Sequence, residues 1–217
     1  MLNMMVDEID AILPDSPIVR SGGSLLLMAG LPGSGKSSIV QEVHPMLSFV
    51  LISTDWVRVQ LHNRPVYTAT EMEKVYDISY QLIVRRLKRG QRVVFDASNY
   101  LAARRERVVR LAKECGAPVA VALVQAAQET IRKRLLQRMS GERQKIDLSD
   151  ADWSVYKWMV EKQEPIVGPH IILDTTHTAP KPLARQLYQY WVQVEANAAG
   201  NLDLQSPSWA SKFIADN

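Results

Sequence analysis

The protein has 217 residues, 47% of them hydrophobic and 23% charged, and a formal net charge of +3. These values are typical of a globular protein with one main domain. A single cysteine, Cys115, excludes a disulfide scaffold. No apolar run approaches the ~20 residues of a membrane span. The acidic N-terminus does not resemble a signal peptide, so we expect a cytoplasmic protein without membrane association.

The chain begins with a predicted short helix, residues 3–13, which Pro14 and Pro17 end. We expect residues 1–23 to be an N-terminal extension. Five apolar runs of strand length follow, separated by helical patterns of ten or so residues, which predicts a parallel sheet built from βαβ units. The predicted strands are 24–29, 49–53, 92–96, 118–124 and 171–174, and the predicted helices include 36–44, 70–89, 101–115, 128–139 and 182–197.

This alternation predicts a three-layer α/β/α domain over residues 24–199, with about five parallel strands and helices on both faces. A polar stretch at about 138–150 is the expected helical lid, and residues 200–217 are a C-terminal tail. Two capping-box patterns mark helix starts, Thr70 with Glu73 and Ser149 with Asp152.

The strongest motif lies between the first predicted strand and helix, where GLPGSGKS matches G-x-x-x-x-G-K-[ST]. Glycines let the backbone curl so that its N–H groups point at phosphate oxygens, and the helix N-terminus favours the same anion. The lysine can reach the terminal phosphates, and the hydroxyl after it can bind Mg²⁺. The predicted nucleotide-binding residues are Gly30, Pro32, Gly33, Ser34, Gly35, Lys36, Ser37 and Ser38. The predicted cofactors are ATP and Mg²⁺.

Polar residues also end the second and third predicted strands, where a doubly wound sheet binds its ligands. Asp55 is placed to take a proton from an attacking hydroxyl, with Arg58 one turn later on the same face. The alternative role of Asp55 is a helix N-cap. Asp96 is predicted to hold Mg²⁺ together with Ser37. Asn99 either binds substrate or caps the next helix, and we expect the cap.

Basic residues cluster on and after the predicted helix 128–139: Arg132, Arg134, Arg138 and Arg143. Kinases exclude water by closing a lid over the triphosphate, and arginine binds phosphate oxygens in a bidentate manner. The alternative is an exposed basic helix.

Taken together, GLPGSGKS, ISTDWVR, VVFDASN and RLLQRMSGER resemble the polynucleotide-kinase-like branch of the P-loop kinases, which includes the zeta-toxin-like kinases and carries an AAA-type ATP-binding domain. The resemblance covers about residues 24–165. It implies transfer of the γ-phosphoryl group of ATP to a hydroxyl. It also implies Asp55 as the general base, Arg58 as an arginine on the acceptor side, and Arg138 or Arg143 as the lid arginine. Lys36 of the phosphate-binding motif completes the predicted catalytic residues.

The sequence departs from this family at Trp56, where an acidic residue is common, and at Ser98, where threonine is common. Trp56 either stacks on the acceptor or packs under the helix 70–89. Residues 85–145 carry a net charge of +11, which favours either a surface that meets polyanions or solvated helix faces. Two other tryptophans, Trp153 and Trp158, are expected in the core, and the alternative for either is a position at the border of the adenine pocket.

The predicted function is therefore an ATP- and Mg²⁺-dependent kinase that binds a nucleoside triphosphate and a hydroxyl acceptor. The acceptor is a nucleic-acid 5′-hydroxyl or a small metabolite. Alternatives are a toxin-like kinase of a sugar nucleotide and an ATPase that hydrolyses without transfer. The guanine-reading string N-K-x-D is absent from the sequence, which argues against a GTPase switch.

Overall fold

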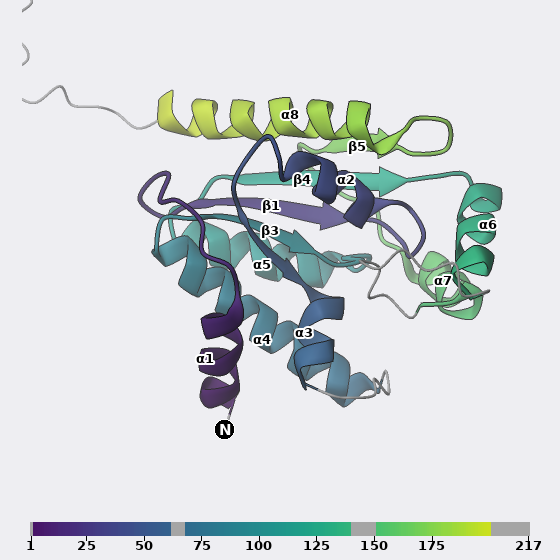
Figure 1. Ribbon diagram of the computed structural model, residues 1–217, viewed down its shortest axis with the longest axis horizontal. Helices are drawn as coiled ribbons and strands as arrows, with labels where there is room; N and C mark the ends of the chain where they lie inside the picture. The colour runs from purple at the N-terminus through teal and green to yellow at the C-terminus, as the bar shows by residue number, and fades with distance from the viewer. Residues whose placement is uncertain (1, 62–67, 140–150, 201–217) are drawn as a thin grey trace, which may run out of the picture.

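The computed structural model describes residues 2–61, 68–139 and 151–200, which form a parallel sheet flanked by helices (Figure 1). The strands are β1 (Ser24–Ala29), β2 (Val50–Ser53), β3 (Arg92–Asp96), β4 (Val119–Gln125) and β5 (Ile171–Asp174), in the order β2-β3-β1-β4-β5. Each predicted strand lies within one residue of an observed one. The carboxyl ends of β1 and β3 lie side by side, with Met28 paired to Asp96.

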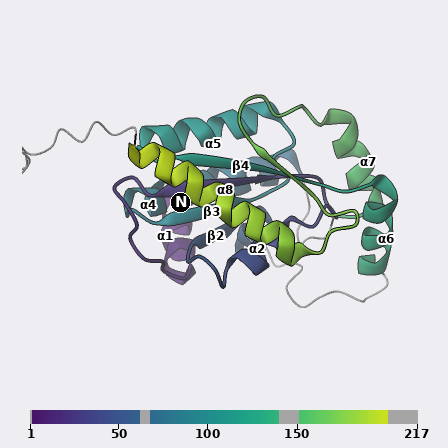
Figure 2. The same cartoon turned by 90° about the horizontal axis from the view of Figure 1, so that it is seen from above.

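Helices cover both faces of the sheet, as Figures 1 and 2 show. The helices are α1 (Leu2–Ile12), α2 (Lys36–Val43), α3 (Thr54–Leu61), α4 (Ala69–Lys88), α5 (Ala102–Glu114), α6 (Gln128–Met139), α7 (Trp153–Lys162) and α8 (Pro180–Gly200). Side chains alternate along β1, so Leu25 and Leu27 pack with α4 and α5 while Leu26 and Met28 pack with α2 and α8. The predicted α/β/α fold is confirmed.

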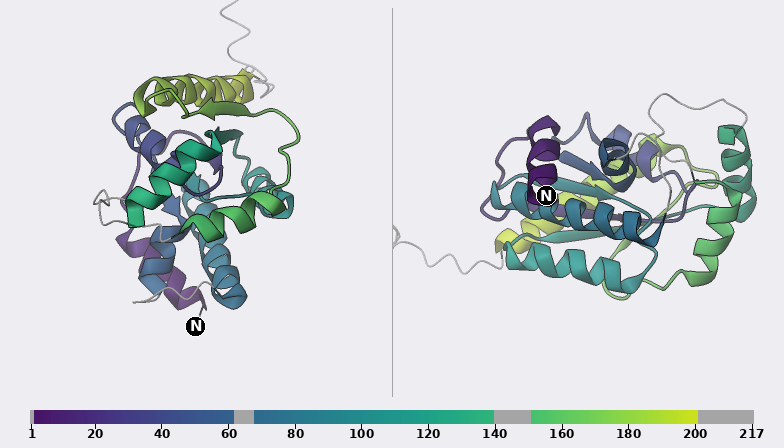
Figure 3. Two further views of the ribbon diagram at one scale, coloured as in Figure 1. Left: turned by 90° about the vertical axis from the view of Figure 1, so that its right-hand side faces the viewer. Right: turned by 90° about the horizontal axis from the view of Figure 1, so that it is seen from below.

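Two helices lie beyond the carboxyl ends of the strands rather than on a face of the sheet. These are α6 and α7, which stand at one end of the molecule in Figures 1 and 3. Their buried side chains, Ile131, Leu135 and Tyr156, form a separate small core with Leu31 and Tyr100. The pair therefore faces the loops that follow β1 and β3. Most of the predicted lid, residues 140–150, lies outside the described residues.

Helix α1 packs against α4 through Val6 and Ile9, which join the larger core. Buried Arg86 on α4 donates to Asp10 at 2.6 Å and to Asp15 at 3.0 Å. Since both apolar and ionic contacts join α1 to α4, the N-terminal segment is packed as part of the fold. The division of the chain at residue 23 stays a prediction.

Helices α2 and α6 begin at Lys36 and Gln128, as predicted, but the predicted cap of α4 was wrong. The N-cap of α4 is Thr68, whose hydroxyl accepts from the N–H of Glu71, so the cap lies two residues before the predicted Thr70. The N-cap of α7 is Asp152, which accepts from Ser154 and Val155. The predicted cap Ser149 lies outside the described residues.

No described helix, over residues 2–61, 68–139 and 151–200, combines the length and the hydrophobicity that crossing a membrane requires.

Candidate active site

The phosphate-binding motif forms the loop between β1 and α2. Gly30 has φ 145° and Gly35 φ 95°, and a Cβ added at Gly30 would lie 2.2 Å from the carbonyl oxygen of Val124. Only glycine fits such a position. The Nζ of Lys36 donates to the carbonyl oxygens of Gly30 at 2.8 Å and Leu31 at 3.3 Å, which folds the lysine back over the loop.

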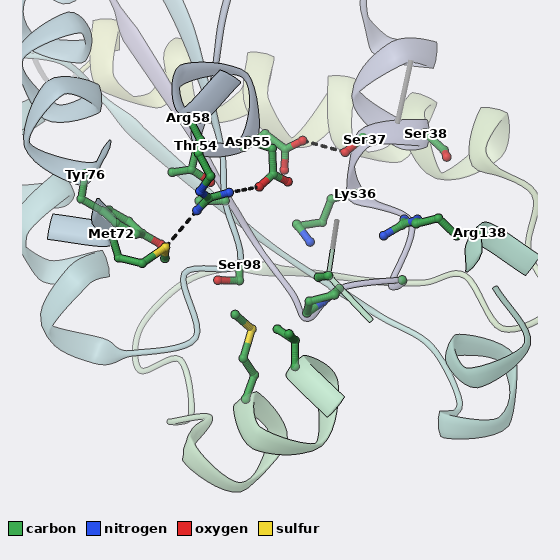
Figure 4. Close-up of a pocket in the computed structure, with 18 of the residues that line it drawn as sticks. Lys36, Ser37, Ser38, Thr54, Asp55, Arg58, Met72, Tyr76, Ser98 and Arg138 are labelled. Carbon is green, nitrogen blue, oxygen red and sulfur yellow. Dashed lines mark hydrogen bonds and ion pairs between the residues drawn. The ribbon is translucent and has the colours of Figure 1, made fainter. Parts of the chain in front are cut away.

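A single pocket holds most of the predicted nucleotide-binding residues. It is lined by Pro32, Gly33, Gly35, Lys36, Ser37 and Ser38, together with Asp55, Arg58, Asp96 and Arg138 (Figure 4). The two remaining members of the motif, Gly30 and Ser34, are not among the lining residues. Ser34 is buried, and its carbonyl oxygen accepts a hydrogen bond from the hydroxyl of Thr175 at 2.7 Å. Both residues therefore belong to the loop without lining the pocket.

Ser37 and Asp96 meet across the ends of β1 and β3. The hydroxyl of Ser37 donates to Oδ2 of Asp96 at 2.9 Å, a contact drawn in Figure 4. A hydroxyl and a carboxylate beside a phosphate site are the oxygen ligands with which proteins hold Mg²⁺, the remaining positions being filled by phosphate oxygens and water. The described residues hold no cluster of three or more His, Cys, Asp or Glu that could bind a metal alone. The residues present fit Mg²⁺ bound together with a nucleotide.

Asp55 and Arg58 lie on α3, which begins directly after β2. Nη1 of Arg58 donates to Oδ1 of Asp55 at 2.7 Å, and its Nε lies 3.1 Å from Oε1 of Glu71 on α4. The side chain of Arg58 is 4% exposed whereas that of Asp55 is 33% exposed. The two carboxylates thus fix the guanidinium, and Asp55 remains open to the pocket.

The arginines of α6 have different positions. Arg138 lines the pocket and reaches toward the phosphate loop in Figure 4. Arg134 donates to the carbonyl oxygens of Gly33 at 3.1 Å and Thr175 at 2.8 Å. Burial lowers the pKa of Arg134 from its ordinary value. Arg134 therefore ties α6 to the phosphate loop and the end of β5, while the predicted Arg143 lies outside the described residues.

Several lining residues were not predicted as part of a site. Met72 and Tyr76 come from α4, and Val155 and Met159 from α7. At the sequence level Met72 and Tyr76 have the spacing of helix-core positions, which hides their second contact with the pocket. Trp56 is not among the lining residues and packs against the core formed by α3 and α4. The structure favours its packing role over stacking on an acceptor.

Two further expectations, for Asn99 and Trp158, changed, whereas the core packing expected of Trp153 is confirmed. Asn99 does not cap α5, whose N-cap is Leu101; it is buried with φ 44°, and its Nδ2 donates to the carbonyl oxygen of Met28 at 2.7 Å. It ties the end of β3 to the end of β1. Trp158 is 47% exposed rather than in the core. Trp153 is half-buried and stacks on Tyr156, with ring centroids 4.8 Å apart.

The comparisons with known proteins bear on this site. A family profile described as "AAA domain" matches residues 25–165, which include the phosphate loop, Asp55, Asp96 and Arg138. The chain belongs to this AAA domain family. The match does not single out the polynucleotide-kinase-like or zeta-toxin-like branch, which stays a prediction.

This family member resembles proteins named as kinases. An L-seryl-tRNA(Sec) kinase from Methanococcus maripaludis is 25% identical over 119 residues, which cover 52% of this chain and 46% of the relative. The match thus spans about half of each protein.

Solved structures share the fold at lower identity. Kti12 from Chaetomium thermophilum in complex with ADP-AlF3 has a TM-score of 0.62 and 21% identity, covering 78% of this chain and 98% of that chain. The APS kinase CysC from Mycobacterium tuberculosis with AMPPNP and APS has a TM-score of 0.59 and 15% identity, covering 80% and 98%. The chain therefore has a kinase-like nucleotide-binding fold.

Proposed function

We propose that the protein is an ATP- and Mg²⁺-dependent kinase that transfers the γ-phosphoryl group to a hydroxyl acceptor. The observation that supports this most is the shared pocket of Lys36, Asp96 and Asp55. Lysine and the loop amides suit binding of phosphates, and a carboxylate beside them suits activation of an alcohol.

Each residue has a part in this proposal. The backbone N–H groups of residues 30–36 and the Nζ of Lys36 bind the triphosphate. Ser37 and Asp96, which are hydrogen-bonded to each other at 2.9 Å, would hold Mg²⁺. The ion would neutralise charge on the phosphate oxygens.

In the transfer step, the acceptor hydroxyl gives its proton to the carboxylate of Asp55. Its oxygen forms a bond to the γ-phosphorus while the bond from that phosphorus to the β,γ-bridging oxygen breaks, which releases ADP. Arg58 holds Asp55 in place at 2.7 Å. Arg138, with Arg143 as the second lid candidate, stabilises the charge on the transferring group.

The acceptor is proposed to be a hydroxyl carried by a nucleic acid. The relative's name specifies a kinase of seryl-tRNA, which bears a hydroxyl on a seryl group attached to RNA. The resemblance of the motifs to polynucleotide kinases points to a 5′-hydroxyl. Seryl-tRNA and 5′-hydroxyl oligonucleotides should therefore be tested side by side as acceptors.

The experiment incubates the protein with γ-labelled ATP and Mg²⁺ against 5′-hydroxyl oligonucleotides, seryl-tRNA, nucleosides, sugars and sugar nucleotides. We expect label on a nucleic-acid acceptor, and none with the Lys36→Ala variant. Label on a sugar or sugar nucleotide alone would refute the acceptor class and keep the kinase. Label found only as free phosphate, with every acceptor, would refute the kinase and identify an ATPase.

A further inference from the structure

Trp158 is an exposed aromatic residue beside the candidate active site. It lies on α7, whose Val155 and Met159 line the pocket. Lys162 is four residues further along the helix, so its side chain and that of Trp158 are neighbours. The indole is 47% exposed, and nothing in the proposed phosphate chemistry uses it.

The indole is held in a defined position. Its ring meets that of buried Tyr100 edge to face, with centroids 5.8 Å apart and an interplanar angle of 66°. The Nζ of Lys162 lies 4.4 Å from the indole centroid. Because Tyr100 supports the indole while the flexible lysine only covers it, an incoming ring can displace the lysine and stack in its place.

A second cation–aromatic pair continues from Tyr100 to the pocket. The guanidinium of Arg104 on α5 lies 3.8 Å from the ring centroid of Tyr76 and 6.0 Å from that of Tyr100. Tyr76 lines the pocket next to Arg58 and Met72. Three aromatic rings and two cations therefore form a continuous series of contacts from the pocket to the exposed indole, here called the aromatic ridge: Tyr76, Arg104, Tyr100, Trp158 and Lys162. Tyr76 and Tyr100 are buried, so Trp158 is the ring of the ridge that is exposed for stacking.

We propose that the aromatic ridge binds the single-stranded part of a nucleic-acid acceptor next to its reacting hydroxyl, an inference that rests on the proposed kinase function. A base stacks on Trp158, and Lys162 contacts a neighbouring phosphate. Stacking platforms flanked by cations recognise single strands without reading their sequence, because every base has a π face.

The test measures binding of a fluorescent, short single-stranded oligonucleotide with a 5′-hydroxyl, by fluorescence anisotropy and without ATP. We expect Trp158→Ala to weaken binding about 5- to 150-fold, the range for loss of one stacked base. Trp158→Phe keeps a ring and should retain most of the affinity. The Lys162→Gln variant should lower the slope of log K against log salt by about 0.7, the value for one single-strand phosphate contact.

Lys181→Gln is the matched control, because Lys181 is an exposed lysine on α8, across the sheet from the ridge. It should leave both affinity and slope unchanged. The proposal is overturned if the wild-type protein does not bind the oligonucleotide at low salt, or if Trp158→Ala binds it as tightly as wild type. It is also overturned if an excess of an unrelated acidic protein displaces the strand and itself binds in a Trp158-dependent manner.

The experiments can refute nucleic-acid binding by the aromatic ridge and the proposed kinase activity independently of each other. Binding that depends on Trp158, without transfer of label to any acceptor, would refute the proposed function and support the ridge. Transfer to an oligonucleotide with the same KM in wild type and Trp158→Ala would support the kinase and refute the ridge.

Discussion

Replacing Asp55 with asparagine removes a proton acceptor from the pocket and leaves the shape of the side chain almost unchanged. Asparagine keeps an oxygen that can accept from Arg58, which now donates to Asp55 at 2.7 Å. Arg58 also keeps its second partner, Glu71, at 3.1 Å. Because the Asp55 side chain is 33% exposed, losing the charge of this hydrogen bond should cost only about 1 kcal/mol of folding stability.

The effect on turnover should be much larger. Loss of a general base lowers kcat by about 10²- to 10⁴-fold, which corresponds to about 3–5 kcal/mol in the activation barrier. The KM for ATP should change little, since Asp55 acts on the acceptor and not on the phosphates. The assay is steady-state transfer of label from ATP to the acceptor identified in the screen.

The matched control is Asp77→Asn on α4, whose half-exposed side chain pairs with Arg107 at 3.1 Å outside the pocket. It should retain wild-type turnover. A kcat for Asp55→Asn within tenfold of wild type would refute the reasoning. So would a large loss of ATP affinity with unchanged turnover, which would make Asp55 a metal ligand and reopen the role of Asp96.

Three further outcomes are expected. Arg86→Met leaves buried Asp10 with one cation fewer, which should lower the free energy of unfolding by about 3 kcal/mol and Tm by about 6–12 °C. Arg85→Met breaks a more exposed ion pair and should lower Tm by less than half as much. Equal Tm shifts of the two variants in calorimetry would contradict this expectation. Asp96→Asn should raise the Mg²⁺ concentration for half-maximal activity at least about tenfold, and an unchanged Mg²⁺ titration would argue against a metal role. Partial burial raises the pKa of the Cys115 thiol above its ordinary value. Its alkylation by iodoacetamide should therefore be slower than that of free cysteine at pH 8 and accelerate only at higher pH. Alkylation as fast as that of free cysteine would contradict the raised pKa.

The strands and the phosphate loop could be predicted from the sequence because their signals are local. Every residue of β1 is buried, and a continuous apolar run is what a central parallel strand requires. The glycines of the loop are needed where the backbone is left-handed or touches β4. The gathering of the phosphate loop after β1, of Asp55 after β2 and of Asp96 at the end of β3 followed from the rule that parallel strands present their carboxyl ends to one edge.

The helix starts were harder, because capping patterns recur within a few residues. Thr68 and Glu71 have the same spacing as Thr70 and Glu73. The side chain of Glu71 turns to the buried guanidinium of Arg58, which belongs to another helix. The sequence does not show this tertiary contact, so it could not show which of the two Thr–Glu pairs begins α4.

The charge of residues 85–145 also depends on tertiary contacts that the sequence does not show. Residues 85–145 are strongly basic along the chain, but Arg85, Arg86 and Arg89 pair with acidic residues of the N-terminal segment. Arg92 likewise binds Glu195 at 2.8 Å. These partners lie about seventy or more residues away in the sequence, so the fold neutralises part of the basic charge of residues 85–145. The two cations of the aromatic ridge, Arg104 and Lys162, are marked by their aromatic neighbours and not by charge density.

The most direct test of the account is a crystal structure with ADP, Mg²⁺, aluminium fluoride and the acceptor found in the screen. We predict that the ADP phosphates lie in the loop of residues 30–37, with Mg²⁺ beside Ser37 and Asp96. The aluminium fluoride group should lie between the β-phosphate of ADP and the acceptor hydroxyl. That hydroxyl should lie about 2.6–3.2 Å from the carboxylate of Asp55. Phosphates bound outside the loop, or an acceptor hydroxyl out of reach of Asp55, would contradict the central claim.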